Sequence, residues 1–137
     1  MRTTTRGLYA LKAMTILAND SSKKHPIPLH AIADREGISV EFLQQIFYRL
    51  RQSGLIAATR GPGGGFFLAQ TAENIPVLKI LEAAGECMEI VPCAEMRKIG
   101  KKPCMKSKAC TAGKFWIELE TLIRKFAEDT SLADVIS

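Results

Sequence analysis

All four cysteines of this 137-residue chain lie within one short stretch, at Cys87, Cys93, Cys104 and Cys110. Six cationic side chains share that stretch: Arg97, Lys98, Lys101, Lys102, Lys106 and Lys108. The thiolate is the form of cysteine that binds metals, and neighbouring positive charge favours the thiolate. The types and spacing of these residues therefore predict a metal or redox centre in residues 86–110.

The residues alone leave the kind of centre open. Cysteine thiolates hold iron–sulfur clusters, whereas structural zinc sites usually pair their ligands about two to four residues apart. The intervals of five, ten and five residues between these cysteines do not fit that zinc pattern. A thiol switch that closes a disulfide is a further alternative. Cys87, on the flank of an apolar helical pattern, is either a ligand or a buried structural thiol.

Composition and charge narrow the class of protein. Hydrophobic residues make up 47% of the chain and charged residues 24%, and there is neither a membrane-length apolar run nor the apolar core of a secretory signal. We therefore expect a cytoplasmic protein without a membrane segment. Residues 1–75 carry nine Lys and Arg against five Asp and Glu, which favours an anionic partner such as nucleic acid. No nucleophile–base pair stands out, so the sequence does not predict an enzyme.

The elements that precede the cysteines predict a helix-turn-helix. Apolar residues recur at helical spacing over residues 4–19, after N-cap hydroxyls at residues 3–5. A second helix over residues 29–36 ends at Gly37, which suits a left-handed helix stop. Ser39 then caps a third helix that ends at Gly54. Two short helices joined by a tight glycine turn are typical of this motif.

The two faces of the third helix differ in chemistry. The face predicted to be buried carries Val40, Phe42, Leu43, Ile46, Phe47 and Leu50, and the opposite face carries Glu41, Gln44, Gln45, Tyr48, Arg51 and Gln52. Gln44 and Gln45 could read adenine in the major groove through bidentate amide contacts. The alternative is a merely solvated face, because any surface helix is amphipathic.

A glycine-rich hairpin follows directly. Strand-like runs over residues 55–59 and 66–69 flank the hexapeptide Arg60, Gly61, Pro62, Gly63, Gly64 and Gly65. Glycines let backbone amides approach phosphates closely, and Arg60 could enter a narrow minor groove. The alternatives are a flexible hairpin tip or another phosphate loop, although a nucleotide P-loop would need Gly-Lys-Ser/Thr leading into a helix. Helices and hairpin together predict a winged helix that binds DNA.

Two more helices flank the cysteine stretch. Asn74 is the expected N-cap of the first, with Pro76 inside its start. The second spans about residues 111–128 and carries a wide apolar stripe, made of Phe115, Trp116, Leu119, Leu122, Ile123 and Phe126. We expect this stripe to pack against a partner subunit, and a two-fold dimer suits palindromic DNA. Residues 131–137 are expected to form a short tail that docks Leu132 and Val135.

Several segments resemble the IscR/NsrR family of bacterial winged-helix regulators. They are the opening Met1-Arg2 with its threonine-rich helix start and Tyr9-Ala10, the segment from Ile38-Ser39 through Arg51, the wing hexapeptide, and the five-residue intervals that separate Cys104, Cys110 and Trp116. The resemblance covers residues 1 to about 135. It implies a homodimer that binds palindromic operators in double-stranded DNA, with three cysteines before the dimerisation helix holding an iron–sulfur cluster.

Carried over position by position, Cys93, Cys104 and Cys110 match the three cluster cysteines of that family, and 2Fe-2S is favoured over 4Fe-4S. The interval of ten residues after Cys93 is longer than the five found in IscR and NsrR themselves. The family's fourth ligand does not carry over. Gly113 stands where the IscR type has a histidine, and Leu8 stands where the NsrR type takes an aspartate from the partner.

A fourth ligand must therefore come from elsewhere in the chain. Cys87 is the local substitute, Glu86 and Glu89 are oxygen donors beside it, and His25 and His30 are remote donors.

On the DNA side, Thr4, Thr5 and Tyr9 are expected to contact phosphate, which positions a protein without reading sequence. The full predicted set is Thr4, Thr5, Tyr9, Ser39, Glu41, Gln44, Gln45, Arg60, Gly61, Pro62, Gly63 and Gly64. The IscR type has Glu at the position of Gln44, so its way of discriminating between operators is not carried over.

The predicted fold is mainly α: a winged helix-turn-helix domain with a small β-hairpin wing (residues 1–85), a cysteine-rich cluster-binding loop (86–110), and a long C-terminal dimerisation helix with a short tail (111–137). The predicted function is a homodimeric repressor whose operator binding is controlled by an iron–sulfur cluster that senses cluster status, iron, nitric oxide or redox state. One alternative is a cluster-free regulator with a thiol-redox switch or a small ligand. Another is an iron–sulfur carrier or electron-transfer protein that does not bind DNA.

Overall fold

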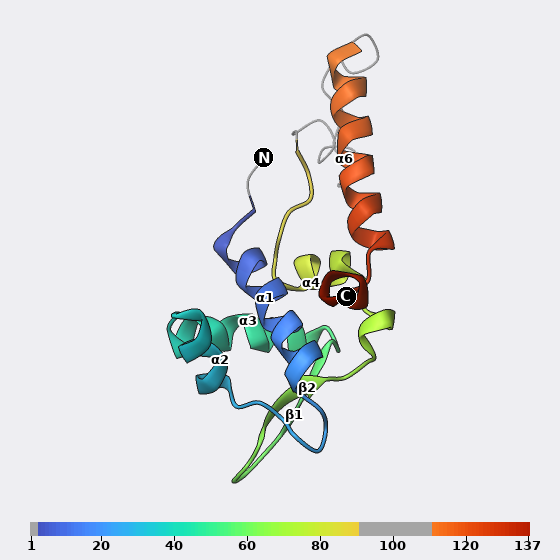
Figure 1. Cartoon of the computed structure of the whole chain (residues 1–137). Coiled ribbons are helices and arrows are strands. Elements are labelled where there is room, and N and C mark those ends of the chain that lie inside the picture. The colour runs from blue at the N-terminus through green and yellow to red at the C-terminus, as the bar shows by residue number, and fades with distance from the viewer. Residues whose placement is uncertain (1–2, 91–110) are drawn as a thin grey trace.

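In the computed structural model, which describes residues 3–90 and 111–137, helices form the body, a two-stranded hairpin projects from its lower end, and one long helix rises away at the opposite end (Figure 1). The elements are α1 (Thr5–Asp20), α2 (Leu29–Glu36), α3 (Val40–Gln52), β1 (Ile56–Thr59), β2 (Gly65–Leu68), the 3-10 turn η1 (Ala72–Asn74), α4 (Val77–Ala83), α6 (Thr111–Asp129) and α7 (Leu132–Ile136). The mainly α fold with one small hairpin is confirmed. In the described ranges, no helix combines the length and apolar character needed to cross a bilayer.

The helix-turn-helix forms at the predicted caps. Gly37 ends α2 in the left-handed region, with a φ of 64°. The Ser39 hydroxyl accepts a hydrogen bond of 3.1 Å from the Phe42 N–H at the start of α3. The buried face of α3 consists of Leu43, Ile46, Phe47 and Leu50. Val40, expected on that face, is 38% exposed, because the first residue of the helix lies beside the turn.

The hairpin gains a third segment that the sequence did not predict. β1 and β2 pair antiparallel, with Ile56 opposite Leu68. Ile27 then bridges to Phe66, and the two residues exchange backbone hydrogen bonds of 2.9 and 2.7 Å. Gly65 permits this approach, because a side chain there would collide with the Ile27 backbone. The wing is therefore anchored to the loop between α1 and α2.

One hydrophobic core joins these elements. Its largest fully buried side chains are Phe47, Met14, Leu17, Ile32, Leu43, Ile46, Leu50, Leu55, Ile75, Ile80 and Leu132. The Phe47 ring packs edge-on against Phe66 of β2, with centroids 4.8 Å apart. Because α3 and the wing share this core, their relative position is fixed by packing.

The C-terminal elements differ from the predictions at two points. Pro76 is the N-cap residue of α4, whereas Asn74 closes η1, donating its N–H to the Thr71 carbonyl. The prediction of an Asn74 cap is wrong because the proline already sets the extended entry to the helix. The tail forms α7, which begins with a Ser131 capping box. Leu132 is buried as expected, but Val135 is 40% exposed because it lines an open cavity.

Candidate nucleic-acid interface and cysteine segment

The outer face of α3 is polar and open to solvent. Glu41, Gln44, Gln45 and Tyr48 are exposed, and together with Arg49 they line a shallow hollow on this face. The opposite face is held in the core, so these side chains are directed outward. Ser39 differs from them, because its hydroxyl caps the helix. The structure thus groups three residues of the predicted DNA-binding set, Glu41, Gln44 and Gln45, on one accessible surface.

The wing is a tight turn whose shape depends on glycine. Gly61 and Gly63 have φ values of 90° and 74°, a region that side chains rarely adopt. The Gly64 N–H donates to the Gly61 carbonyl at 2.9 Å, and a Cβ on Gly64 would collide with the Thr59 carbonyl oxygen. Arg60 and Pro62 are exposed at this turn. Among the described residues, nothing lies within 4 Å of a Cβ built at Gly61 or Gly63, so a phosphate or groove wall can approach the turn closely.

The start of α1 holds the remaining predicted contacts. Thr5 is exposed, and Tyr9 is half-buried with its ring edge-on against Phe42 of α3 at 6.1 Å. Thr4 is the N-cap, and its hydroxyl accepts from the Gly7 N–H at 3.3 Å. The same hydroxyl donates to Glu86 at 2.8 Å. The start of α1 is therefore in contact both with α3 and with Glu86, the residue before the cysteine segment, by which we mean residues 87–110.

Cys87 is the one predicted cluster cysteine within the described residues, and Cys93, Cys104 and Cys110 lie outside them. Cys87 is exposed, so the alternative of a buried structural thiol is wrong. Its Sγ donates to Glu89 Oε2 at 3.1 Å. Across residues 3–90 and 111–137, no three His, Cys, Asp or Glu side chains are grouped as a metal site requires.

The chemical type of the available ligands, cysteine thiols, nevertheless fits an iron–sulfur cluster. Thiolates are the preferred ligands of such clusters, and the exposed Cys87 thiol stands at the entry to the segment that contains the other three. The Glu86 carboxylate is engaged by Thr4, which disfavours Glu86 as a ligand. Leu8 is 53% exposed and apolar, and it offers no donor.

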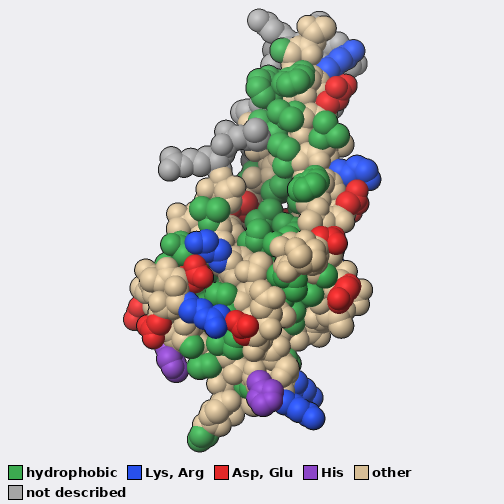
Figure 2. Space-filling model, in the orientation of Figure 1, with side chains coloured by type: hydrophobic (Ala, Val, Ile, Leu, Met, Phe, Trp, Pro, Cys, Tyr) green, Lys and Arg blue, Asp and Glu red, His purple; other side chains and the backbone are tan. Residues whose placement is uncertain are grey.

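The long helix α6 carries an apolar face that the described part of the chain leaves uncovered. Phe115, Trp116, Leu122 and Phe126 are 57%, 39%, 65% and 74% exposed. Figure 2 shows hydrophobic side chains along this helix and continuing onto the body of the molecule. A 2.7 Å ion pair between Arg124 and Glu82 links this helix to α4.

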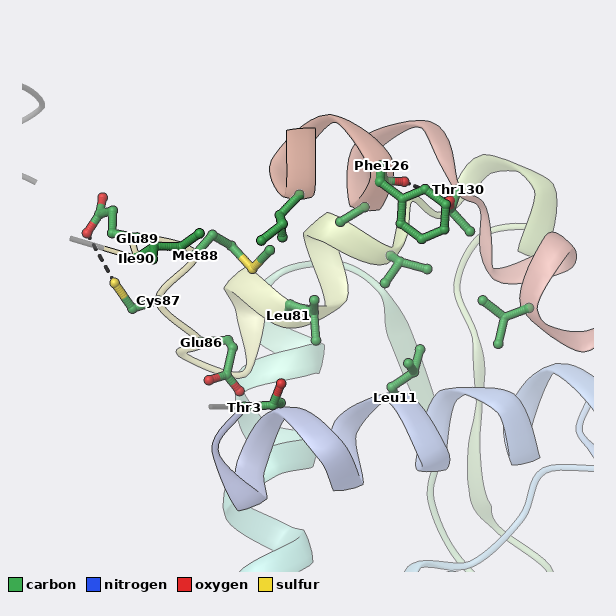
Figure 3. Close-up of a pocket in the computed structure, with 14 residues that line it drawn as sticks. Thr3, Leu11, Leu81, Glu86, Cys87, Met88, Glu89, Ile90, Phe126 and Thr130 are labelled. Atoms are coloured by element: carbon green, nitrogen blue, oxygen red, sulfur yellow. Dashed lines mark hydrogen bonds between the residues drawn. The ribbon is translucent and has the colours of Figure 1, made fainter. Parts of the chain in front are cut away.

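A cavity of about 580 Å³ lies where α6 meets the body. Apolar side chains from α1, α4 and α6 line it, among them Leu11, Leu81 and Phe126 (Figure 3). Residues 86–90, at the entry to the cysteine segment, form one wall. The Ile90 N–H donates to Glu120 of α6 at 3.4 Å. The entry to the cysteine segment thus contacts both α6 and the winged helix.

Comparison with known proteins agrees with this arrangement. A family model named Rrf2 and described as an iron-dependent transcriptional regulator matches residues 3–137. The chain belongs to the Rrf2 family. The predicted resemblance is confirmed, because this Rrf2 chain is also similar to curated IscR regulators over its full length. It is 36% identical to those of Erwinia tasmaniensis and Serratia proteamaculans over 137 residues, all of this chain and 79% and 80% of theirs.

Solved structures of Rrf2 proteins share the fold. IscR of T. potens superposes with a TM-score of 0.76 at 26% identity, covering 99% of this chain and 86% of the other. The oxidised form of Staphylococcus aureus CymR gives 0.73 at 28% identity, covering 100% and 97%. CymR of B. subtilis, at 23% identity and a TM-score of 0.79 over 99% and 96%, supports the fold alone. The winged-helix fold and the function of a DNA-binding transcription regulator, rather than an enzyme, are thereby confirmed.

The contact between Glu86 and the start of α1 was not predicted from the sequence. The two residues are separated by 82 positions, and no local pattern joins them. One signal was available. Gly7 stands inside the first turn of a predicted helix, where glycine is unfavourable unless another group approaches closely. That group is the Glu86 carboxylate.

Proposed function

We propose that this Rrf2 protein is a cytoplasmic, homodimeric repressor whose binding to a palindromic operator is controlled by a cysteine-held iron–sulfur cluster. The observation that carries the proposal is the place of the cysteine segment, between the winged helix, which ends with α4, and the apolar helix α6. Its entry contacts both parts. A change in the conformation of the cysteine segment would therefore alter the distance between the recognition helices (α3) of the two subunits.

Dimerisation is supported by the uncovered face of α6. The helix has 19 residues, so it is about 28 Å long. An apolar surface of this extent on a small protein marks an interaction site, and the adjoining cavity continues it onto the body of the molecule. A self-complementary contact between two such helices gives two-fold symmetry, which the half-sites of a palindrome match.

The DNA-reading role is supported by the exposed surfaces of α3, the wing and α1. Gln44 and Gln45 would contact base edges in the major groove, and Arg60 would enter the minor groove. Thr5 and Tyr9 would contact phosphate. Thr4, whose hydroxyl is engaged by Gly7 and Glu86, would act by orienting the helix start.

In the sensor, Cys93, Cys104 and Cys110 would hold the cluster, of the 2Fe-2S type, and Cys87 is the nearest candidate for a fourth donor. When bound, the cluster supplies a redox-active centre whose potential depends on net charge and hydrogen bonding. The chain contributes the charge: six Lys and Arg side chains accompany the cysteines and would raise that potential.

The test is the anaerobic absorption spectrum with iron and sulfide analysis. We expect coloured protein with charge-transfer bands that disappear in Cys104→Ala. In Cys87→Ala, a changed spectrum or a less stable cluster would assign Cys87 as a ligand, whereas unaltered behaviour would exclude it. Colourless protein without iron, prepared anaerobically, would contradict the cluster proposal.

A second candidate is a thiol-redox regulator without a cluster. It is favoured by the likeness to the oxidised form of S. aureus CymR and by the exposed Cys87 thiol. In that case operator affinity would respond to oxidant and reductant in iron-free protein, and thiol labelling would identify the cysteines that react.

A further inference from the structure

Glu86, immediately before Cys87, holds the start of α1. The Thr4 N–H donates to both of its carboxylate oxygens, at 2.9 and 3.1 Å, and the Thr4 hydroxyl donates to Oε2 at 2.8 Å. The Gly7 N–H in turn donates to that hydroxyl. A negative charge at a helix N-terminus is also favoured by the helix dipole. This carboxylate thus satisfies the donors at the end of α1 that approaches DNA in the proposed function.

The contact is closely fitted. A Cβ on Gly7 would collide with Glu86 Oε2 and lie 2.9 Å from the carboxyl carbon. Gly7 itself is buried, so the carboxylate rests on bare backbone in the first turn of the helix. In Figure 3, Glu86 lies beside Thr3 at the beginning of α1, while Cys87 and Glu89 follow on the same segment.

Gly85, the residue before Glu86, lies close to α3, the helix proposed to read DNA. Gly85 has a φ of 86°, and it turns the chain from the end of α4 into the cysteine segment. A Cβ at Gly85 would lie only 2.7 Å from Arg49 Nη1 of α3, and 3.6 Å from the Arg6 guanidinium of α1. Residues 85 and 86 therefore meet α1 and α3 at one point, which we call the junction: Thr4, Gly7, Arg49, Gly85 and Glu86.

We propose that Glu86 is a positioning residue that transmits the state of the cysteine segment to the DNA-binding surface, by fixing the start of α1 relative to α3. This inference rests on the proposed function, because it presupposes that the segment has two states. A displacement of Cys87 moves its covalent neighbour Glu86, and Thr4 is bound to Glu86 by two donors. The transmission needs no contact between the cysteines and DNA.

The alternative role for Glu86 is a passive brace. A brace supports α1 equally in both states of the segment, so its loss weakens DNA binding by the same factor in each. A transmitting residue carries part of the coupling free energy between the two sites, so its loss reduces the ratio of the two affinities. The ratio therefore separates the two roles even where a variant is less stable.

The experiment measures affinity for a duplex selected from random sequence by the wild-type protein. Each protein is assayed as purified anaerobically and again after its iron has been removed by a chelator. For the wild type we expect the two affinities to differ by a factor of roughly 5 to 150, the usual range of allosteric coupling. In Glu86→Ala we expect the ratio to fall to within about twofold of one, with the cluster spectrum unchanged.

Matched variants complete the test. Thr4→Val removes the hydroxyl donor and should also lower the ratio, whereas Thr4→Ser keeps the hydroxyl and should preserve it. Glu73→Gln alters an exposed carboxylate of η1, and it should leave the ratio unchanged. Hydrogen exchange of the amides of residues 4–7 should differ between the two states of the wild type and not in Glu86→Ala.

Two results would overturn the inference. If Glu86→Ala and Thr4→Val weaken binding equally in both states and leave the ratio intact, Glu86 is a brace. If the wild type binds DNA equally well before and after iron removal, the cluster does not control DNA binding, and Glu86 has no signal to transmit. The wild-type measurement thus distinguishes failure of the proposed function from failure of this inference.

Discussion

At the residue scale, Asp134 illustrates a cap whose strength depends on pH. Its carboxylate accepts from the Ser131 N–H at 2.9 Å, while its own N–H donates to the Ser131 hydroxyl. The backbone hydrogen bond from Ser131, followed by the side-chain bond, lowers the pKa of Asp134 below the ordinary value of 3.8. Because the folded state favours the charged form of Asp134, the cap stabilises α7 at pH values above 3.8. Its contribution is lost as the pH falls through the lowered pKa.

We therefore expect Asp134→Asn to lower the melting temperature slightly at pH 7, by an amount that shrinks as the pH falls below 3.8 and through the lowered pKa of Asp134. Thermal unfolding of both proteins across this range measures the effect, and carbon NMR of the carboxyl group measures the pKa directly. A titration midpoint at or above the ordinary aspartate value would contradict the assignment. Ser137→Ala, at the other end of α7, is the control.

Short-range chemistry made many single residues predictable. The Ser39 cap and the Gly37 stop involve neighbours three and four positions away, so the local sequence contains the whole interaction. The exposure of Cys87 and the hydrogen bonds from Thr4 to Glu86 depend on how α1 packs beside the end of α4. Such long-range packing is decided by the core and leaves no periodic signal in the local sequence.

At the scale of elements, the wing makes a sharp prediction. Arg60→Ala removes the proposed minor-groove contact, and Gly64→Ala forces the turn to open because the new Cβ meets the Thr59 carbonyl. Both changes should weaken operator binding about tenfold or more, corresponding to one contact worth about 1–3 kcal/mol. Binding should be measured by fluorescence anisotropy at several salt concentrations.

The same two variants distinguish loss of the Arg60 contact from distortion of the turn. Arg60→Ala should reduce the salt dependence of binding, whereas Gly64→Ala retains the charge and should reduce affinity mainly by misplacing it. Gln70→Ala lies at the other end of the hairpin, where its amide bonds the Gly54 carbonyl, and it serves as the control. Unchanged affinity in both wing variants would exclude the wing from the interface.

Elements with a clear period, cap or turn were predicted, whereas contacts between segments distant in the chain were not. α3 and the hairpin follow from apolar periodicity and the glycine-rich turn. The Ile27 bridge to Phe66 was missed because Ile27 stands between two prolines and shows no strand pattern of its own. The Ser131 residue that opens α7 likewise pairs with Pro76, so the tail is bound into the winged helix by a distant segment.

At the scale of the whole molecule, the apolar face of α6 predicts the assembly state. Leu122 and Phe126 are the most exposed large apolar side chains of the helix, so in a dimer they would lie at its interface. Leu122→Glu or Phe126→Glu would bury an unpaired carboxylate there, which is strongly unfavourable. We expect the wild type to sediment as a dimer and each variant as a monomer. Glu118→Gln, an exposed polar position on the same helix, should remain dimeric.

DNA binding should depend on dimerisation, because the two linked winged helices of a dimer bind two half-sites with a high effective concentration. Separating them should lower affinity for a palindrome by about a hundredfold or more, yet leave the affinity for an isolated half-site unchanged. Sedimentation and anisotropy on the same samples measure both quantities. A wild type that sediments as a monomer at the concentrations where it binds DNA would contradict the dimer. An equal loss of affinity for the half-site and the palindrome would instead show that the variants disturb the winged helix, which α6 contacts through α4 and the pair of Arg124 and Glu82.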